Sequence, residues 1–231
     1  MRSSTPPDLR GRCTQCYLQE RWCVCASIEP ITVSFNLVVL RHWKESWRTS
    51  NTGRLANLAI EHSNVLDYGA PNQEFDDSSL RAPNTFLLFP SLDHSHGLLK
   101  DATEPPATPL EMLPSLGRSL STLVVVDASW GQARKMVRRI AALESLPRVT
   151  VDSPPQHTPR LRRPPFPGAM ATIEAISAAV RVLEGPQPAD ALDELFTRFV
   201  RNARAQRGGD GLDRHSTPNP QSGTSKDSPT T

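Results

Sequence analysis

A carboxylate and an indole ring stand close together near the middle of the chain, directly after a run of apolar residues. Residues 123–126 are typical of a fully buried strand, Asp127 follows them, and Ser129 and Trp130 precede a helical segment. Ligands of open α/β sheets bind at the carboxyl ends of strands. Asp127 therefore sits where the chemistry of such folds is usually done. The alternative is a helix cap, in which the carboxylate binds backbone N–H groups.

The four cysteines of the chain all fall between residues 13 and 25, as a C-x2-C pair followed by a C-x-C pair. No apolar run is long enough to span a membrane and the first residues lack the apolar core of a secretion signal, so we expect a cytoplasmic protein. Disulfides are rare there, and four close thiolates suit a structural, tetrahedral Zn²⁺. Two disulfides or four free thiols are the alternatives. The predicted zinc ligands are Cys13, Cys16, Cys23 and Cys25.

The positive charge of the chain is concentrated in one region, although the formal net charge is only +2. Residues 134–163 hold eight basic residues against two acidic ones. A local basic field of this kind favours binding of a polyanion such as RNA. The alternative is a solvated helix face followed by a basic loop. The predicted RNA contacts are Arg134, Arg138, Arg139, Arg160, Arg162 and Arg163.

Apolar runs and helical spacing alternate along the chain, which predicts an α/β fold. The expected strands are residues 34–40, 64–67, 85–89, 123–126 and 148–151. The expected helices are residues 54–62, 132–143, 169–184 and 188–206. The proline-rich residues 101–118 have little to bury, so we expect them to form a connector.

Polar residues also follow or precede the other predicted elements. His42 and Glu45 come after the first strand, where a local surface pair is the simplest interpretation. Asn51 or Thr52 can cap the next helix, and a helix N-terminus that follows a strand is also an anion site. The helix expected at 169–184 has polar residues in its first turn, where they cap the helix and complement its dipole.

Five short motifs of the chain occur in the same order in one known family. They are the four-cysteine cluster, H-x-x-E followed by NTGRLA, LLFP, VVDASWGQARKM, and LRRPP followed by ATIEA. Over residues 13–200 they resemble the DTW-domain proteins, which are tRNA-uridine aminocarboxypropyltransferases related to SPOUT-type RNA-modifying enzymes. The D-x-T-W of that family is Asp127-Ala-Ser-Trp130 here, and the serine keeps the hydroxyl group.

The resemblance implies a SPOUT-like parallel sheet flanked by helices. It also implies transfer of the 3-amino-3-carboxypropyl group of S-adenosylmethionine to N3 of a uridine in tRNA, with release of methylthioadenosine. The catalytic candidates are Asp127, Ser129 and Trp130. Asp127 would be the general base that accepts the uridine N3 proton, its pKa raised by burial beside Trp130, and the indole would stack on the uracil ring. In this assignment a helix N-terminus and the Arg54 guanidinium bind the donor carboxylate. The full set of predicted donor-binding residues is Asn51, Thr52, Gly53, Arg54, Phe89, Pro90, Ala171, Thr172 and Glu174.

The chain then divides into four parts. We expect residues 1–12 and 207–231 to be disordered, 13–30 to form the zinc-binding module and 31–206 to form the catalytic domain. Two other functions stay open, namely a SPOUT-like RNA methyltransferase and a non-catalytic zinc-containing RNA-binding protein. Two features argue against the RNA-binding protein, namely a buried carboxylate at a strand end and a pocket built from three separated motifs. A protein that only binds RNA needs neither feature.

Overall fold

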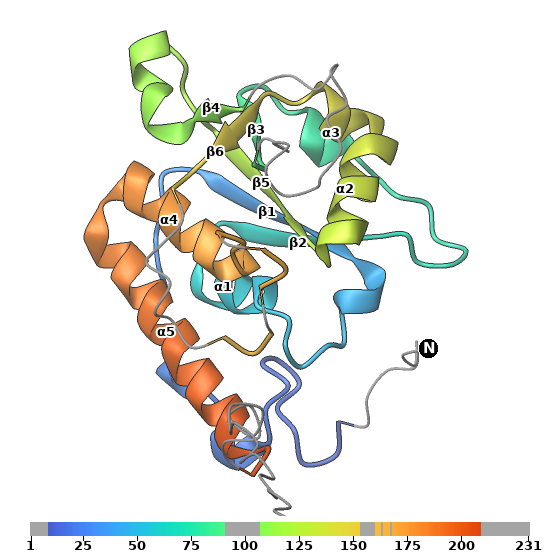
Figure 1. Ribbon diagram of the computed structural model, residues 1–231, viewed down its shortest axis with the longest axis vertical. Coiled ribbons are helices and arrows are strands. Elements are labelled where there is room, and N and C mark those ends of the chain that lie inside the picture. The colour runs from blue at the N-terminus through green and yellow to red at the C-terminus, as the bar shows by residue number, and fades with distance from the viewer. Residues whose placement is uncertain (1–8, 91–106, 153–159, 163, 167, 209–231) are drawn as a thin grey trace, which may run out of the picture.

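Six parallel strands form the centre of the structure, with helices on both sides (Figure 1). The computed structural model describes residues 9–90, 107–152, 160–162, 164–166 and 168–208. The strands are β1 (Asn36–His42), β2 (Ser63–Tyr68), β3 (Thr85–Leu88), β4 (Thr108–Pro109), β5 (Thr122–Asp127) and β6 (Arg148–Thr150), in the order β2-β1-β5-β3-β6-β4. The prediction of an α/β fold with a helix-flanked parallel sheet is confirmed.

Each face of the sheet packs against its own set of helices (Figure 1). One face is covered by α1 (Gly53–Ala59), α4 (Thr172–Glu184) and α5 (Pro186–Ala205), and the other by α2 (Trp130–Arg139) and α3 (Ala141–Ser145). Successive side chains of a strand point to opposite faces, so alternate residues of β1 enter the two cores. Because β1, β3 and β5 are covered on both faces, each of them contains a continuous apolar run, which is why the sequence pattern identified them.

The order in which strands are added to the sheet reverses between β1 and β5. After β1 the chain passes through α1 to β2, and after β5 it passes through α2 and α3 to β6, which lies on the other side of the sheet. Arg41 pairs in register with Asp127, so β1 and β5 end at the same edge. Open α/β sheets bind ligands in the crevice at such a reversal, which therefore lies between the ends of β1 and β5.

Two expectations about local structure are corrected. The connector contributes the edge strand β4 beside β6, followed by 3-10 turns that bury Leu110 and Leu113. A proline fits in β4 because an edge strand leaves one side unpaired. The helix expected at 132–143 divides at Ile140, whose backbone is extended and whose side chain is buried. Of the ends expected to be disordered, the described residues are 9–12, where Arg12 pairs with Gln19 in a bridge, and 207–208.

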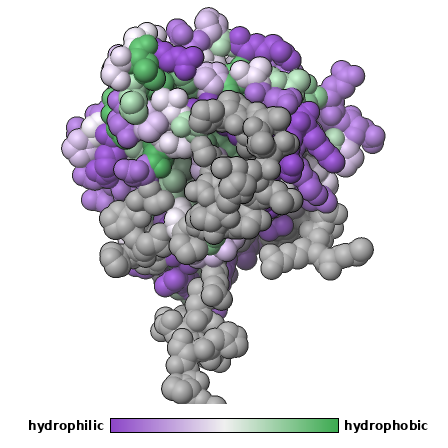
Figure 2. Space-filling model, turned by 45° about the horizontal axis from the view of Figure 1, so that its top comes forward, coloured by the Kyte–Doolittle hydropathy of each residue, from purple (hydrophilic) through white to green (hydrophobic). Residues whose placement is uncertain are grey.

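The visible surface of the described residues is mostly hydrophilic, with hydrophobic side chains gathered in small areas near the top of the view (Figure 2). The large apolar side chains that are exposed in the described part are Met112, Leu116 and Val182. None of the described helices combines the length and the apolar character needed to cross a lipid bilayer.

Candidate active site

A cavity of about 410 Å³ opens at the reversal between β1 and β5. We call it the main pocket. Its walls come from the loop after β1, the end of β5, residues 160–162, 164 and 165, and the start of α4. Segments that lie far apart in the sequence thus meet at one edge of the sheet. This edge holds the carboxyl ends of the strands, where ligands of open α/β sheets bind.

Asp127 is the buried carboxylate of the main pocket, with only 4% of its surface exposed. Its Oδ1 accepts a hydrogen bond of 2.7 Å from the Thr172 hydroxyl, and its Oδ2 accepts one from the Asn51 amide. Burial raises the pKa of Asp127 and the nearby Glu45 carboxylate adds to this, while the two hydrogen bonds act in the opposite direction. The helix-cap alternative is wrong, because both carboxylate partners are side chains from other segments.

The start of α2 is capped by different residues. The Gln132 side chain accepts hydrogen bonds from the Ser129 backbone N–H at 3.0 Å and from the Ser129 hydroxyl at 2.6 Å. The Gln132 amide also lies 3.2 Å from His42 Nδ1, which joins the end of β1 to α2. Ser129 therefore orders the turn that follows Asp127, and its side chain also lines the main pocket.

Asn51 and Gly53 bring the start of α1 against Asp127. The side-chain Oδ1 of Asn51 accepts a hydrogen bond of 3.1 Å from the Arg54 backbone N–H, while its Nδ2 donates to Asp127. A Cβ atom on Gly53 would lie 2.7 Å from Cγ and Oδ2 of Asp127, and 3.0 Å from a methyl group of Val39. Only glycine leaves the carboxylate in its observed place.

We expect Gly53→Ala to reduce turnover by about 100-fold, because an ångström of displacement at a reacting group can have an effect of that size. The loss of folding free energy should be only about 1–3 kcal/mol, the usual range for overpacking. Turnover and melting temperature measured on the same preparation separate the two effects. Gly131→Ala is the matched control, since a Cβ there meets nothing within 4 Å and should have a much smaller effect. Equal turnover in both variants would contradict this assignment.

Glu45 is not the surface residue that we expected. Only 2% of it is exposed, and it lines the main pocket. Its Oε2 is 2.8 Å from Arg162 Nη2, and the Arg162 Nε donates to the Ser50 hydroxyl at 2.8 Å. Nothing local in the sequence indicated this, because Glu45 and Arg162 are 117 residues apart.

Arg54 does not line the main pocket, although the sequence suggested that it binds the donor carboxylate. Its guanidinium donates to the backbone carbonyls of Ser46 and Arg48 and stacks on the Tyr17 ring, 3.7 Å from the ring centroid. Tyr17 belongs to the four-cysteine segment. Arg54 thus connects that segment to the loop that carries Glu45 and Asn51.

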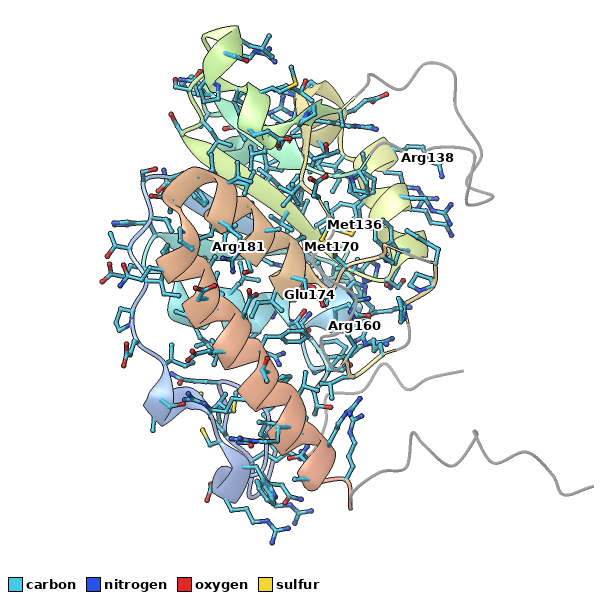
Figure 3. All side chains as sticks on the ribbon, turned by 60° about the vertical axis from the view of Figure 1, so that its left-hand side comes forward. Met136, Arg138, Arg160, Met170, Glu174 and Arg181 are labelled. Carbon is cyan, nitrogen blue, oxygen red and sulfur yellow. The ribbon has the colours of Figure 1, made fainter. Side chains whose placement is uncertain are left out.

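Glu174, in the first turn of α4, caps the helix and pairs with Arg160. Glu174 Oε2 accepts a hydrogen bond of 2.6 Å from the Ala171 N–H, and its Oε1 pairs with Arg160 Nε at 2.9 Å (Figure 3). The cap expected from Glu174 is therefore present. Arg160 also donates to the Ala169 carbonyl at 2.7 Å. Its guanidinium thus joins residue 160 to the start of α4, and its predicted contact with RNA stays a prediction.

A second, smaller cavity of about 160 Å³ adjoins the main pocket. We call it the apolar pocket, since its wall includes Phe89, Trp130, Phe166 and Met170. Trp130 lies edge-on to Phe166 with ring centroids 4.9 Å apart. The residues shared by the walls of both pockets are Ala128, Trp130, Met170, Ala171 and Thr172. The predicted Pro90 lines the apolar pocket, whereas no sequence pattern pointed to Phe166 or Met170.

Thr52 also connects two walls of the main pocket. Its hydroxyl accepts a hydrogen bond of 3.4 Å from the Ile173 N–H, which joins the start of α1 to the start of α4. Of the predicted donor-binding residues, the structure brings Asn51, Thr52, Ala171 and Thr172 to the main pocket. Phe89 and Pro90 lie in the apolar pocket, while Gly53, Arg54 and Glu174 act behind the walls.

The four cysteine sulfurs form a single cluster in which every sulfur is within 4.8 Å of the others. All four thiols are free, so the disulfide alternative is wrong. Two of the Sγ···Sγ distances, Cys13 to Cys25 and Cys16 to Cys23, are 3.6 and 3.7 Å. A tetrahedron with Zn–S bonds of about 2.3 Å has edges of about 3.8 Å, so the cluster fits a zinc ion in size and donor type. The backbone N–H groups of Gln15 and Cys25 also point at Cys13 and Cys23 sulfurs.

The predicted RNA-contact arginines do not share one environment. Arg138 and Arg139 are exposed on α2, and Figure 3 shows Arg138 pointing away from the sheet. Arg134 is half-buried on the same helix, and Arg162 lines the main pocket. Arg163 lies outside the described residues.

Comparison with known proteins finds a matching family and curated relatives, two of which share one name. The family model of the DTW domain matches residues 10–204. The tRNA-uridine aminocarboxypropyltransferase 2 of Drosophila melanogaster is 27% identical over 190 residues, which are 79% of this chain and 70% of that protein. The protein of the same name from Macaca fascicularis is 20% identical over 186 residues, 78% of this chain and 58% of its own length. No solved structure matches the chain significantly.

Proposed function

Since the chain belongs to the DTW domain family, we propose that it is a tRNA-uridine aminocarboxypropyltransferase. It would transfer the 3-amino-3-carboxypropyl group of S-adenosylmethionine to N3 of a uridine in tRNA. The observation that carries the proposal is the buried Asp127, which lines the main pocket together with Trp130, a residue that borders both pockets. A protein that only binds RNA has no need of a buried carboxylate held by Asn51 and Thr172 in a cavity.

The two pockets suit the two ends of the donor. The apolar pocket offers aromatic and aliphatic surface from Phe89, Pro90 and Phe166 to the adenosine. The main pocket offers charged and hydrogen-bonding groups to the amino acid arm and to the uridine. Trp130 and Thr172 border both pockets, so the sulfonium would lie near them.

Asp127 is the proposed general base. Uridine N3 carries a proton and becomes a good nucleophile only when it loses it. The Asp127 carboxylate would accept this proton while the N3 electron pair forms a bond to the arm carbon attached to sulfur. The carbon–sulfur bond breaks in the same step, and its electron pair stays on sulfur, which leaves as neutral methylthioadenosine. Trp130 would stack on the uridine ring.

The exposed face of α2 is the proposed contact with the tRNA backbone. Replacing both Arg138 and Arg139 by glutamine should weaken tRNA binding and reduce the slope of log Kd against log salt by about 0.7–0.9 for each phosphate that is no longer bound. Binding measured at a series of salt concentrations gives this slope. Arg201→Gln removes an exposed arginine of α5 and should leave the slope unchanged. An unchanged slope in the double variant would remove α2 from the interface.

The four-cysteine cluster is the proposed zinc site. Four thiolate ligands leave no open coordination position, so the ion would supply stability and no chemistry at the pocket. Free thiols and a tRNA substrate both suit the cytoplasm, which is the proposed location.

The by-product distinguishes this function from the methyltransferase alternative. With S-adenosylmethionine and unmodified tRNA, the proposed reaction forms methylthioadenosine in step with tRNA modification, whereas methyl transfer forms S-adenosylhomocysteine. Chromatography of the small molecules tells the two apart. Formation of S-adenosylhomocysteine would refute the proposed function. Binding of tRNA without either product would favour the RNA-binding alternative.

A further inference from the structure

The residues of a charged cluster at the edge of the main pocket neither accept nor donate the proton in the step described above. It consists of Glu45, Arg48, Ser50 and Arg162, and all but Arg48 line the main pocket. Glu45 is 98% buried, in contact with the Arg162 guanidinium at 2.8 Å. A carboxylate is seldom removed from water so completely unless it is paired and hydrogen-bonded, so each of its two oxygens should have a donor.

The two oxygens of Glu45 differ in their partners. Oε2 accepts a hydrogen bond from Arg162, but Oε1 has no hydrogen-bond donor among the described residues. Arg48 Nε lies 3.0 Å from Oε1, yet its N–H is not directed at this oxygen. A buried acceptor without a donor is unfavourable, so a cationic N–H group that enters the pocket would gain a charge-assisted hydrogen bond here.

Arg162 has hydrogen-bonding capacity left for an anion. A guanidinium has five N–H donors, and this one uses Nε for Ser50 and Nη2 for Glu45. Within the described part of the chain, Nη1 has no partner. The other arginine that lines the main pocket, Arg160, donates to Glu174 and the Ala169 carbonyl, and only 13% of its side chain is exposed, against 42% for Arg162. Arg162 is therefore the cation that a ligand carboxylate can reach more readily.

Glu45 Oε1 can still accept a hydrogen bond, and the neighbouring Arg162 guanidinium can still donate one. The two groups together match a ligand that carries one positive and one negative charge. We infer that Glu45 and Arg162, with Ser50, form the subsite for an α-amino acid group, with Glu45 binding the ammonium and Arg162 the carboxylate. The inference rests on the proposed function, which supplies such a group as the arm of S-adenosylmethionine. Arg162 takes the place that the sequence suggested for Arg54, whose guanidinium faces Tyr17 and backbone carbonyls.

The subsite accounts for the choice of group to be transferred. With the adenosine in the apolar pocket and the end of the arm at Glu45, the arm must extend through the main pocket past Asp127. The arm carbon attached to sulfur is then the one presented to a nucleophile beside Asp127. A methyltransferase would instead have to turn the methyl group toward this carboxylate.

The test compares two ligands that differ in the arm. S-adenosylhomocysteine carries the amino acid group and methylthioadenosine lacks it. We expect Glu45→Gln and Arg162→Gln each to weaken binding of S-adenosylhomocysteine by about 10- to 100-fold, the effect of losing one charged hydrogen bond. Binding of methylthioadenosine, measured by calorimetry, should stay within about twofold, which also shows that each variant is folded. Glu144→Gln, on the exposed side of α3, is the matched control and should change neither affinity.

Two outcomes would overturn the inference. If both variants bind S-adenosylhomocysteine as the unaltered protein does, the amino acid group lies elsewhere while the proposed function stands. If they lose both ligands equally, Glu45 and Arg162 support the whole pocket and do not select the arm. Failure of the unaltered protein to bind either ligand would overturn the proposed function, and the subsite with it. Arg162 is 42% exposed on its side chain, so its variant should remain folded even if Glu45→Gln does not.

Discussion

Asp127→Asn is expected to reduce the transfer rate by about 100- to 10,000-fold, the usual contribution of a general base. Asparagine keeps the size of the side chain and the bond from Thr172, but it cannot accept the N3 proton. Binding of S-adenosylhomocysteine should stay within about twofold, because the base has no role in holding the donor. Single-turnover rates and calorimetry measure the two effects. Asp77→Asn, which removes a partly exposed carboxylate paired with Arg81 outside the main pocket, is the control and should retain activity. Full turnover by Asp127→Asn would exclude Asp127 as the base.

The raised pKa of Asp127 gives this prediction a pH dependence. Only the ionised carboxylate accepts a proton, so activity should increase as the pH rises through the pKa of Asp127 in the folded protein. Stability should change in the opposite direction. Burial favours the protonated form, so the stabilisation from this group is present below its unfolded pKa of about 3.9 and is lost as the pH rises through the folded pKa. Melting temperatures over a pH series should show this loss in the unaltered protein and not in Asp127→Asn.

Removal of the proposed zinc ion from the four-cysteine cluster is expected to lower the melting temperature by roughly 8–16 °C. An ion present at about 1,000 times its Kd stabilises a protein by about 4 kcal/mol, and each kcal/mol corresponds to about 2–4 °C for a chain of this size. The effect should extend beyond the cluster, because Cys16, Leu18 and Val24 belong to the same core as α4 and α5. The Trp22 carbonyl also accepts a hydrogen bond of 3.0 Å from Asn202 of α5.

Metal content measured by mass spectrometry, together with melting curves before and after chelation, tests this prediction. Cys16→Ser should reproduce the loss, since it removes one ligand. Ser27→Ala is the control within the same segment: it removes a hydroxyl bonded to the Val24 carbonyl and no ligand, and should lower stability by only about 1 kcal/mol. A metal-free protein that melts at the same temperature would show that the cluster needs no ion.

The sheet and the place of Asp127 could be predicted because both follow from local sequence. The central strands β1, β3 and β5 are buried on both faces, so each contains an apolar run, and a polar residue just after such a run lies at the ligand-binding edge. The four cysteines are likewise close in sequence. The two-residue strand β4 could not be found in this way, since it is too short to show a period.

The remainder of the site depends on contacts between distant segments. Asn51 is 76 residues from Asp127 in the chain, and Arg162 is 117 from Glu45. The direction of the Arg54 side chain is set by Tyr17, from another module, and by carbonyls of its own loop. For Arg54, Arg160 and Arg162, the local sequence showed only that a basic residue lies in a loop or at the start of a helix. It could not show whether the guanidinium faces the cavity, as that of Arg162 does, or a structural partner, as those of Arg54 and Arg160 do.

The most direct test of the proposed function follows two labels of the donor into product. S-adenosylmethionine is prepared with one isotope in the carboxyl carbon of the arm and another in the methyl group, and is incubated with the protein and unmodified tRNA. The proposed function predicts that the arm label appears in a uridine of the tRNA and that the methyl label leaves in methylthioadenosine. Methyl label in the tRNA, with the arm label in S-adenosylhomocysteine, would contradict it.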